Sequence, residues 1–147
     1  MNKLSEIVVR PGATEHGVGL ICVKRVPANT KICNCEAKHC KIVPLDRIKN
    51  LPIGVRQTIH DLFDGLHTVH GRQFCQIPTD YDQSIPLVAF INHSLTPTCY
   101  FDDGDWCIRS RRILKRGEEA TVNYCMYQEP ESYTYKYAAA NFKRRPL

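Results

Sequence analysis

The sequence lacks any apolar run long enough to cross a membrane. Its longest such run, IPLVAFI at residues 85–91, falls far short of the roughly 20 residues that a membrane-spanning helix needs. The first residues, MNKLSEIVVRPG, also lack the continuous apolar core of a secretory signal. We therefore expect no membrane association and an intracellular location, with cytoplasm and nucleus both open.

The sequence also lacks internal repeats, low-complexity linkers and a second domain boundary. Its 147 residues are 43% hydrophobic and 24% charged, which is typical of an ordinary soluble domain. We therefore predict one domain over residues 1–147. Within it we expect an inserted helical segment at about 42–80 and an aromatic helical tail at about 127–147.

A strongly basic surface is also missing. The net charge of +5 comes from scattered residues, and the basic residues cluster only at RSRR (109–112) and KRR (143–145). Charge runs of this size are typical of a solvated face. Direct binding of nucleic acid is therefore not expected.

Short β-branched segments dominate what is present. Residues 6–10 and 19–26 have the composition of strands, and VAFI before Asn92 reads as a buried strand. Apolar residues spaced three and four apart predict a helix over 52–66, and the Asp-Asp-Gly-Asp turn at 102–105 predicts a hairpin. An alternating strand is expected to run into Tyr124. The predicted fold class is α+β, mostly β.

Three of the eight cysteines and one of the six histidines, all of which could bind metal, gather in one segment, CNCEAKHC. They are Cys33, Cys35, His39 and Cys40. Structural zinc sites use two separated pairs of ligands, whereas Cys33 and Cys35 alternate along an expected strand. We therefore predict reduced, buried thiols and no metal site, with zinc as the open alternative.

Three segments of the sequence contain candidate residues for a functional site. Gly17 and Gly19 flank Val18 just before an expected strand, where backbone without side chains lets a ligand approach, although such glycines also serve ordinary turns. Asn92, His93 and Ser94 follow the apolar run directly, and their side chains could instead satisfy backbone groups at a strand end. Tyr124, taken alone, is typical of a core ring.

Taken together, these segments resemble the SET-domain family of protein lysine methyltransferases. The matching segments are HGVGLICVKRVPANTKI, AFINHSLTP and LKRGEEATVNY, in the family's order. The second resembles the family motif R-F-x-N-H-S-C-x-P-N, and the third resembles G-E-E-L-T-x-x-Y. With the residues between them they cover 6–127.

The resemblance implies a fold, a cofactor and a catalytic residue. The fold would be a set of small β-sheets with short helices and a pseudoknot, in which the chain after Asn92 passes through a loop closed near Tyr124. The cofactor would be S-adenosylmethionine, and Tyr124 would stand where the substrate lysine meets the methyl group. The expected cofactor-binding residues are Gly17, Val18, Gly19, Asn92 and His93.

Several positions depart from the family pattern. Leu95 and Thr98 stand where the family often has Cys and Asn, and no zinc cluster follows Tyr124. The substrate channel would then come from tail aromatics, for which simple helix packing is the alternative. Those aromatics are Tyr127, Tyr133, Tyr135, Tyr137 and Phe142. Val122 is small where the family often has Phe or Tyr, which leaves the number of methyl groups open.

The partner implied by the resemblance is a lysine-bearing protein or peptide, with a histone among the candidates. A chain without flanking modules could use a second copy of itself to complete its surface as a homodimer. The competing hypothesis is an inactive SET-like module that binds a peptide or a nucleic acid. Retention of Asn92, His93 and Tyr124 together favours the enzyme, because a binding module has no chemical need for that set.

Overall fold

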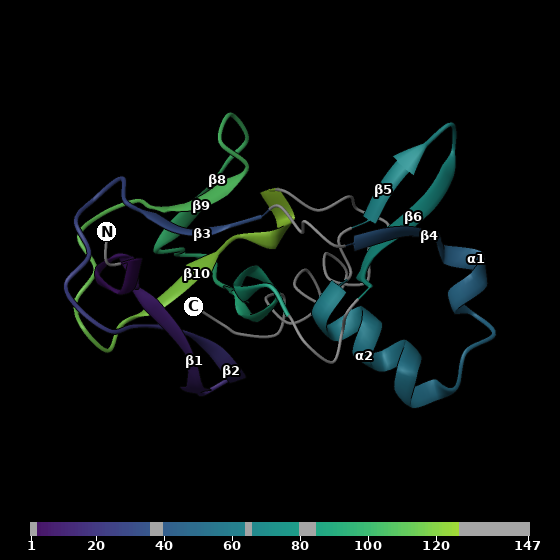
Figure 1. Ribbon diagram of the computed structural model, residues 1–147, viewed down its shortest axis with the longest axis horizontal. Helices are drawn as coiled ribbons and strands as arrows, with labels where there is room; N and C mark the ends of the chain where they lie inside the picture. The colour runs from purple at the N-terminus through teal and green to yellow at the C-terminus, as the bar shows by residue number, and fades with distance from the viewer. Residues whose placement is uncertain (1–2, 36–39, 64–65, 80–84, 127–147) are drawn as a thin grey trace. The chain divides into compact units, whose positions relative to one another are not determined.

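The computed structural model describes residues 3–35, 40–63, 66–79 and 85–126 (Figure 1). The chain divides into two compact units: Met1–Glu36 with Pro86–Asn123, and Ala37–Ile85 with Tyr124–Leu147. The single domain over 1–147 stays a prediction. Among the described residues, no helix has the length and apolar character needed to span a membrane.

The first unit contains two small sheets. The four-stranded sheet has the order β1-β2-β10-β7, and the three-stranded sheet has the order β3-β9-β8. The strands are β1 (Val9–Thr14), β2 (Gly17–Cys22), β3 (Lys31–Asn34), β7 (Asn92–His93), β8 (Cys99–Asp102), β9 (Cys107–Ser110) and β10 (Glu119–Val122). Two short 3-10 helices complete it, η1 (Lys3–Glu6) and η2 (Leu87–Phe90).

The hairpin of β1 and β2 differs from the two strands that the sequence predicts. The strand predicted at 6–10 begins at Val9 and continues through Pro11 to Thr14. Proline is accommodated because β1 is the edge strand of its sheet, where a missing N–H leaves no internal partner unpaired. The strand predicted at 19–26 begins earlier, at Gly17, so the glycine motif lies within β2.

The segment before Asn92 is also different. VAFI was expected to be a buried strand, and this is wrong: Leu87–Phe90 forms the 3-10 turn η2 after Pro86. Proline favours this start because it cannot donate a backbone hydrogen bond, and the N–H of Ala89 bonds its carbonyl at 2.9 Å. Ile91 alone in this segment is buried.

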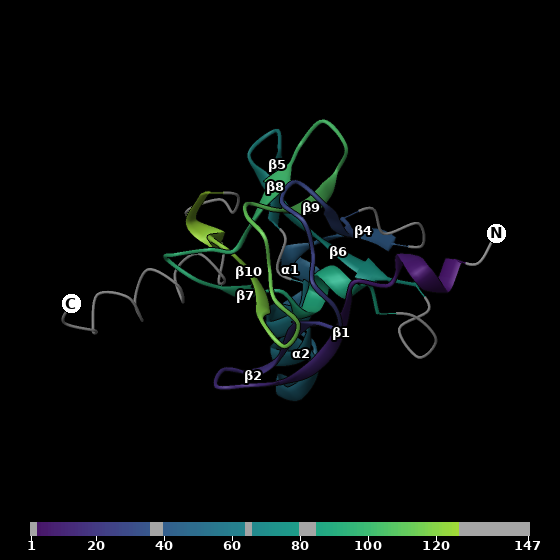
Figure 2. The same ribbon diagram turned by 90° about the vertical axis from the view of Figure 1, so that its left-hand side faces the viewer.

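Asn92 and His93 form β7, which pairs with β10 in parallel (Figure 2). Asn92 lies opposite Thr121, and His93 lies opposite Val122. Because β10 also pairs with Leu20 and Ile21 of β2, it lies between the glycine strand and the Asn92 strand. The sheet therefore brings two distant sequence motifs to one surface.

The core of the first unit lies beneath these strands. Leu20, Val26 and Leu114 are fully buried, and Val26 bridges Leu114 through two backbone hydrogen bonds of 2.9 Å. The predicted hairpin around residues 102–105 is confirmed as β8 and β9.

The second unit contains a helix pair and a separate sheet. Its strands are β4 (Cys40–Pro44), β5 (Leu66–Val69) and β6 (Arg72–Pro78), in the order β4-β6-β5. Its helices are α1 (Leu45–Ile48), α2 (Ile53–Phe63) and the 3-10 helix η3 (Tyr124–Met126). The helix predicted over 52–66 is confirmed as α2, and Ile48, Ile59 and Cys75 form the core. The segment 42–80 thus holds three strands as well as its helices. The fold is α+β and mostly β, as predicted.

Candidate functional site

The start of β2 exposes backbone. Gly17 has φ +106°, a conformation that side-chain-bearing residues rarely adopt, and a Cβ there would meet no atom within 4 Å. Val18 is 52% exposed, whereas Gly19 is buried. The structure therefore leaves open space beside the backbone of Gly17, exposes the residue Val18 and buries Gly19.

The Asn92 side chain crosses from β7 to this strand. Its Nδ2 donates to the carbonyl oxygen of Val18 at 3.2 Å and to Glu119 Oε1 at 2.7 Å. A third, longer contact of 3.5 Å reaches Thr14 Oγ1. Residues from β1, β2, β7 and β10 thus meet at one amide group, which we call the Asn92 cradle: Thr14, Val18, Gly19, Asn92 and Glu119.

The acceptors in this cradle fix which way the amide points. A backbone carbonyl and an ionised carboxylate can only accept, so both must face the NH2 group and not the oxygen of Asn92. Among the described residues, no donor is bonded to Asn92 Oδ1. The cradle therefore leaves one strong acceptor for a ligand donor.

Glycine at position 19 is required by this arrangement. A Cβ there would overlap Glu119 Oε1 and would lie 2.8 Å from Asn92 Nδ2 and 2.7 Å from Thr14 Cγ2. The sequence assigned Gly19 to the cofactor because glycines expose backbone. Its packing gives a different reason for the glycine, which is to make room for the pair of Asn92 and Glu119.

His93 follows Asn92 on β7 and is half-buried. Burial lowers the pKa of its imidazole below the ordinary value, because a low-dielectric environment disfavours the charged form. His93 is therefore neutral at pH 7.

Thr98 and Thr121 fasten the chain after β7 to β10. The Thr121 N–H donates to Thr98 Oγ1 at 2.9 Å, and the Thr98 N–H donates to Thr121 Oγ1 at 3.2 Å. Thr98 Oγ1 also donates to the Glu119 carbonyl at 3.0 Å. Thr98, a departure from the family pattern, thereby anchors the strand that carries Glu119.

Tyr124 lies in the second unit. The strand expected to run into it is shorter than predicted, because β10 ends at Val122 and Tyr124 begins η3. Tyr124 is half-buried. Its placement beside the Asn92 cradle stays a prediction. The five tail aromatics predicted to line the substrate channel lie outside the described residues: Tyr127, Tyr133, Tyr135, Tyr137 and Phe142.

The cysteine segment is only partly described. Burial raises the pKa of Cys33 and of Cys35 to about 12, so both thiols are protonated at pH 7. Zinc binds thiolates, and these environments favour the neutral thiol before any metal arrives. His39 lies outside the described residues, as does the Cys40 side chain, so the zinc alternative stays untested.

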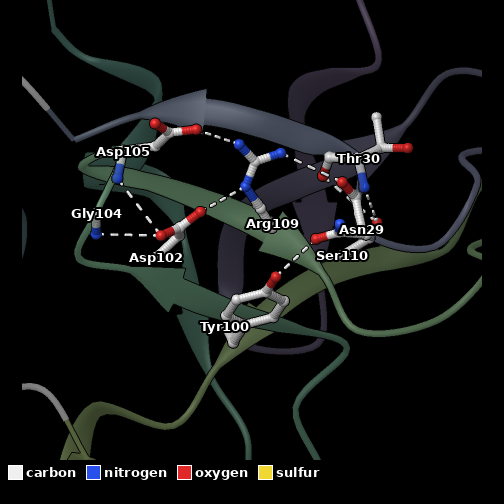
Figure 3. A network of polar contacts seen from close by, with 8 residues as sticks. All are labelled: Asn29, Thr30, Tyr100, Asp102, Gly104, Asp105, Arg109 and Ser110. Carbon is white, nitrogen blue, oxygen red and sulfur yellow. Dashed lines mark hydrogen bonds and ion pairs between the residues drawn. The ribbon is translucent and has the colours of Figure 1, made fainter.

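A second group of ligand-type side chains lies on the β8–β9 hairpin. Atoms of Asp102, Asp105 and Cys107 lie within 4.8 Å of one another. Arg109 occupies both carboxylates: its Nε donates to Asp102 Oδ2 at 2.6 Å, and its Nη2 pairs with Asp105 (Figure 3). A cation here would face the guanidinium, so this group serves the hairpin and is not a convincing metal site.

The sequence pointed to the glycines and to Asn92 but missed Glu119, Thr14 and Thr121. Glu119 stands in the quoted motif GEEATVNY, yet nothing in the motif distinguishes it from Glu118. Glu118 bonds Arg112 and the Lys115 N–H instead. Strand alternation was the available indication, because it places Glu119 and Thr121 on one face of β10.

Comparisons with known proteins identify the family of the chain. The SET domain family model matches residues 17–125, which is more than half of the chain, so the chain belongs to the SET-domain family. SET domains are in general protein lysine methyltransferases. No curated protein matches the chain. The crystal structure of a Plasmodium falciparum protein, described as a candidate histone methyltransferase, is similar with 16% identity and a TM-score of 0.44, over 79% of this chain and 91% of that one.

Proposed function

We propose that the chain is an S-adenosylmethionine-dependent protein lysine N-methyltransferase. The observation that supports this most is the Asn92 cradle. It holds an amide whose NH2 group is engaged and whose oxygen accepts from no described residue, and open space lies beside the backbone of Gly17, one residue before the bonded Val18 carbonyl. A purely structural asparagine does not require an amide oxygen without a partner, whereas an asparagine that binds the N–H donor of a ligand requires one.

The described residues fit S-adenosylmethionine. This molecule carries an ammonium group, for which an amide oxygen is a suitable acceptor. The space beside Gly17 admits a ligand close to the backbone. The residues that would hold it are Gly17, Val18, Asn92 and His93, and Gly19, which is buried, would contribute by making room for the pair of Asn92 and Glu119. When bound, the cofactor supplies a methyl group on a sulfonium sulfur, which a lysine amine takes by in-line displacement.

The protein's task is to deliver a neutral amine. A lysine of pKa about 10.4 is neutral in roughly one molecule per 2,500 at pH 7, equivalent to about 4.6 kcal/mol. An apolar channel lowers that pKa by desolvating the ammonium. We assign Tyr124 to orient the amine, since a phenol can both donate and accept a hydrogen bond. Alignment of the reacting atoms then contributes several kcal/mol.

The substrate we propose is a lysine side chain of a protein, and histone tails are one candidate. The competing hypothesis, an inactive SET-like module, predicts binding without transfer. Incubation with a peptide array and radiolabelled S-adenosylmethionine, followed by mass spectrometry of the labelled peptides, separates the two. It would also give the number of methyl groups that the small Val122 leaves open.

The decisive variant is Tyr124→Phe. We expect it to bind S-adenosylmethionine by calorimetry with an affinity close to that of the wild type and to lose methyl transfer by at least about 100-fold, in the range for loss of one positioned catalytic group. The matched control is Tyr100→Phe, which removes a hydroxyl from the β8–β9 hairpin and should leave transfer unchanged. A wild type that binds no S-adenosylmethionine would refute the proposed function.

A further inference from the structure

Glu119 is the residue of the Asn92 cradle to which the proposed function gives no role. Its Oε1 accepts from Asn92 Nδ2 at 2.7 Å, the shortest of the three contacts made by that amide. Glu119 is half-buried, and it is the only charged side chain among the described residues that bonds Asn92. A hydrogen bond to a charged acceptor is about twice as strong as one between neutral groups.

The carboxylate decides the orientation of the Asn92 amide. Without it, the amide could turn by 180° and present its NH2 group to the ligand at the cost of the bond to the Val18 carbonyl. With it, that turn would face the amide oxygen with a carboxylate oxygen and would lose two hydrogen bonds at once. Glu119 therefore holds Oδ1 in the only position where it can accept from a ligand.

The packing of Gly19 against the pair of Asn92 and Glu119 also supports this role. Gly19 leaves a space that a single methyl group would fill, and that space is occupied by Glu119 Oε1 and Asn92 Nδ2. The backbone of Glu119 is also held in place, because Thr98 Oγ1 donates to its carbonyl at 3.0 Å and Ile21 of β2 pairs with it in the sheet. Glycine, backbone and side chain thus all constrain where the carboxylate lies.

We propose that Glu119 is a positioning residue for the cofactor, which holds the Asn92 amide with its oxygen toward an N–H donor of S-adenosylmethionine. This rests on the proposed function. Glu119 acts through Asn92 and does not itself touch the ligand. Its effect on binding should therefore disappear when the Asn92 amide is absent.

A double-mutant cycle on ligand binding tests this dependence. S-adenosylmethionine is titrated by calorimetry into the wild type, Glu119→Ala, Asn92→Ala and the double variant. We expect each single variant to weaken Kd about 10- to 100-fold, the range for a hydrogen bond to a charged group, and the double variant to be no weaker than the weaker single one. Effects that multiply, or an unchanged Kd in Glu119→Ala, would overturn the proposal.

Matched variants separate positioning from general damage. Glu119→Gln keeps the volume and an oxygen that can accept from Asn92, so we expect a smaller loss of affinity than in Glu119→Ala, and it serves if the alanine variant does not fold. Glu118→Ala removes the neighbouring carboxylate, which bonds Arg112 and Lys115 instead, and should bind as the wild type does. Equal losses in Glu118→Ala and Glu119→Ala would contradict the proposal.

A measurement without ligand keeps this test distinct from that of the proposed function. The side-chain NH2 signals of Asn92, identified by their loss in Asn92→Asp, should shift in the nitrogen–proton spectrum of Glu119→Ala and not in that of Glu118→Ala. Unshifted signals would overturn the positioning role. A wild type that binds no S-adenosylmethionine refutes both proposals, whereas a binding wild type with an unaffected Glu119→Ala refutes this one alone.

Discussion

Two polar clusters in the first unit differ in how many of their hydrogen-bonding groups have partners among the described residues. On the β8–β9 hairpin, Arg109 donates from all three of its nitrogens, to Asp102, Asp105 and the Asn29 carbonyl, and Asp102 accepts with both oxygens (Figure 3). In the Asn92 cradle, the two donors are engaged and, among the described residues, the acceptor is not. A closed cluster holds a turn in place, whereas an open one can also bind.

The largest effect should come from filling the cradle. Gly19→Ala places a methyl group against Glu119 Oε1 and Asn92 Nδ2, so the pair must separate. We expect the Kd for S-adenosylmethionine to rise about 10- to 100-fold by calorimetry, which is the equivalent of ordinary overpacking.

The control for this change lies directly across the ladder. Gly12 pairs with Gly19, and a Cβ there would meet the side chains of Ile21 and Arg10, which are not part of the cradle. Gly12→Ala should therefore change thermal stability while leaving Kd close to that of the wild type. Equal weakening of binding by both variants would remove the distinction between the two glycines.

The next largest effect is expected at the fastening of β10. Thr98→Val leaves the Thr121 N–H and the Glu119 carbonyl without their partner in a buried site. We expect the free energy of unfolding to fall by about 1–3 kcal/mol in a urea titration. Thr96→Val, at an exposed position two residues earlier, should change it by less than about 0.5 kcal/mol.

An acid titration should then distinguish His93. Because burial lowers its pKa in the folded state, the unfolded chain binds the proton more readily, and stability falls as pH drops below the ordinary value of about 6.5. We expect His93→Gln to lose less stability than the wild type between pH 7.5 and pH 5. A curve for His93→Gln that matches that of the wild type would contradict the assignment.

The smallest effect is expected at the closed cluster. Arg109→Met removes a partly buried ion pair with Asp102, and the Arg109 pairing keeps the pKa of Asp102 below its usual range. We expect a modest fall in Tm at low ionic strength that shrinks in high salt, with no change in the Kd for S-adenosylmethionine. A weakened Kd would show that the two clusters are not independent.

Local sequence patterns predict a large part of the fold. The turn at 102–105 and the apolar spacing over 52–66 predict β8–β9 and α2, because turn chemistry and helical period are properties of neighbouring residues. The pairing of β4 with β6 and the parallel pair of β7 with β10 were not predicted, since such pairings join residues far apart in the chain. The hairpin of β5 and β6, turned at His70 and Gly71, was also not predicted, although its strands are adjacent in the chain.

The candidate site also has one part that local motifs predict and another that depends on contacts between distant residues. Asn92 and Gly19 could be proposed from the sequence because they stand in recognisable motifs. The contact between Asn92 and Glu119 joins residues 27 positions apart, and no property of either residue indicates it. The 3-10 turn at Leu87–Phe90 was mistaken for a strand because a short apolar run has the same composition in both conformations.

The position of β10 in the sheet also has a consequence for how the molecule is made. In a chain emerging from the ribosome, Gly19 and Asn92 are synthesised well before Glu119, yet β7 pairs with no other described strand than β10. Residues 94–118 must first be closed into a loop, and contacts of such separation form late in folding. The cradle should thus be among the last parts of the first unit to assemble, so an unfinished chain would lack the Asn92–Glu119 pair.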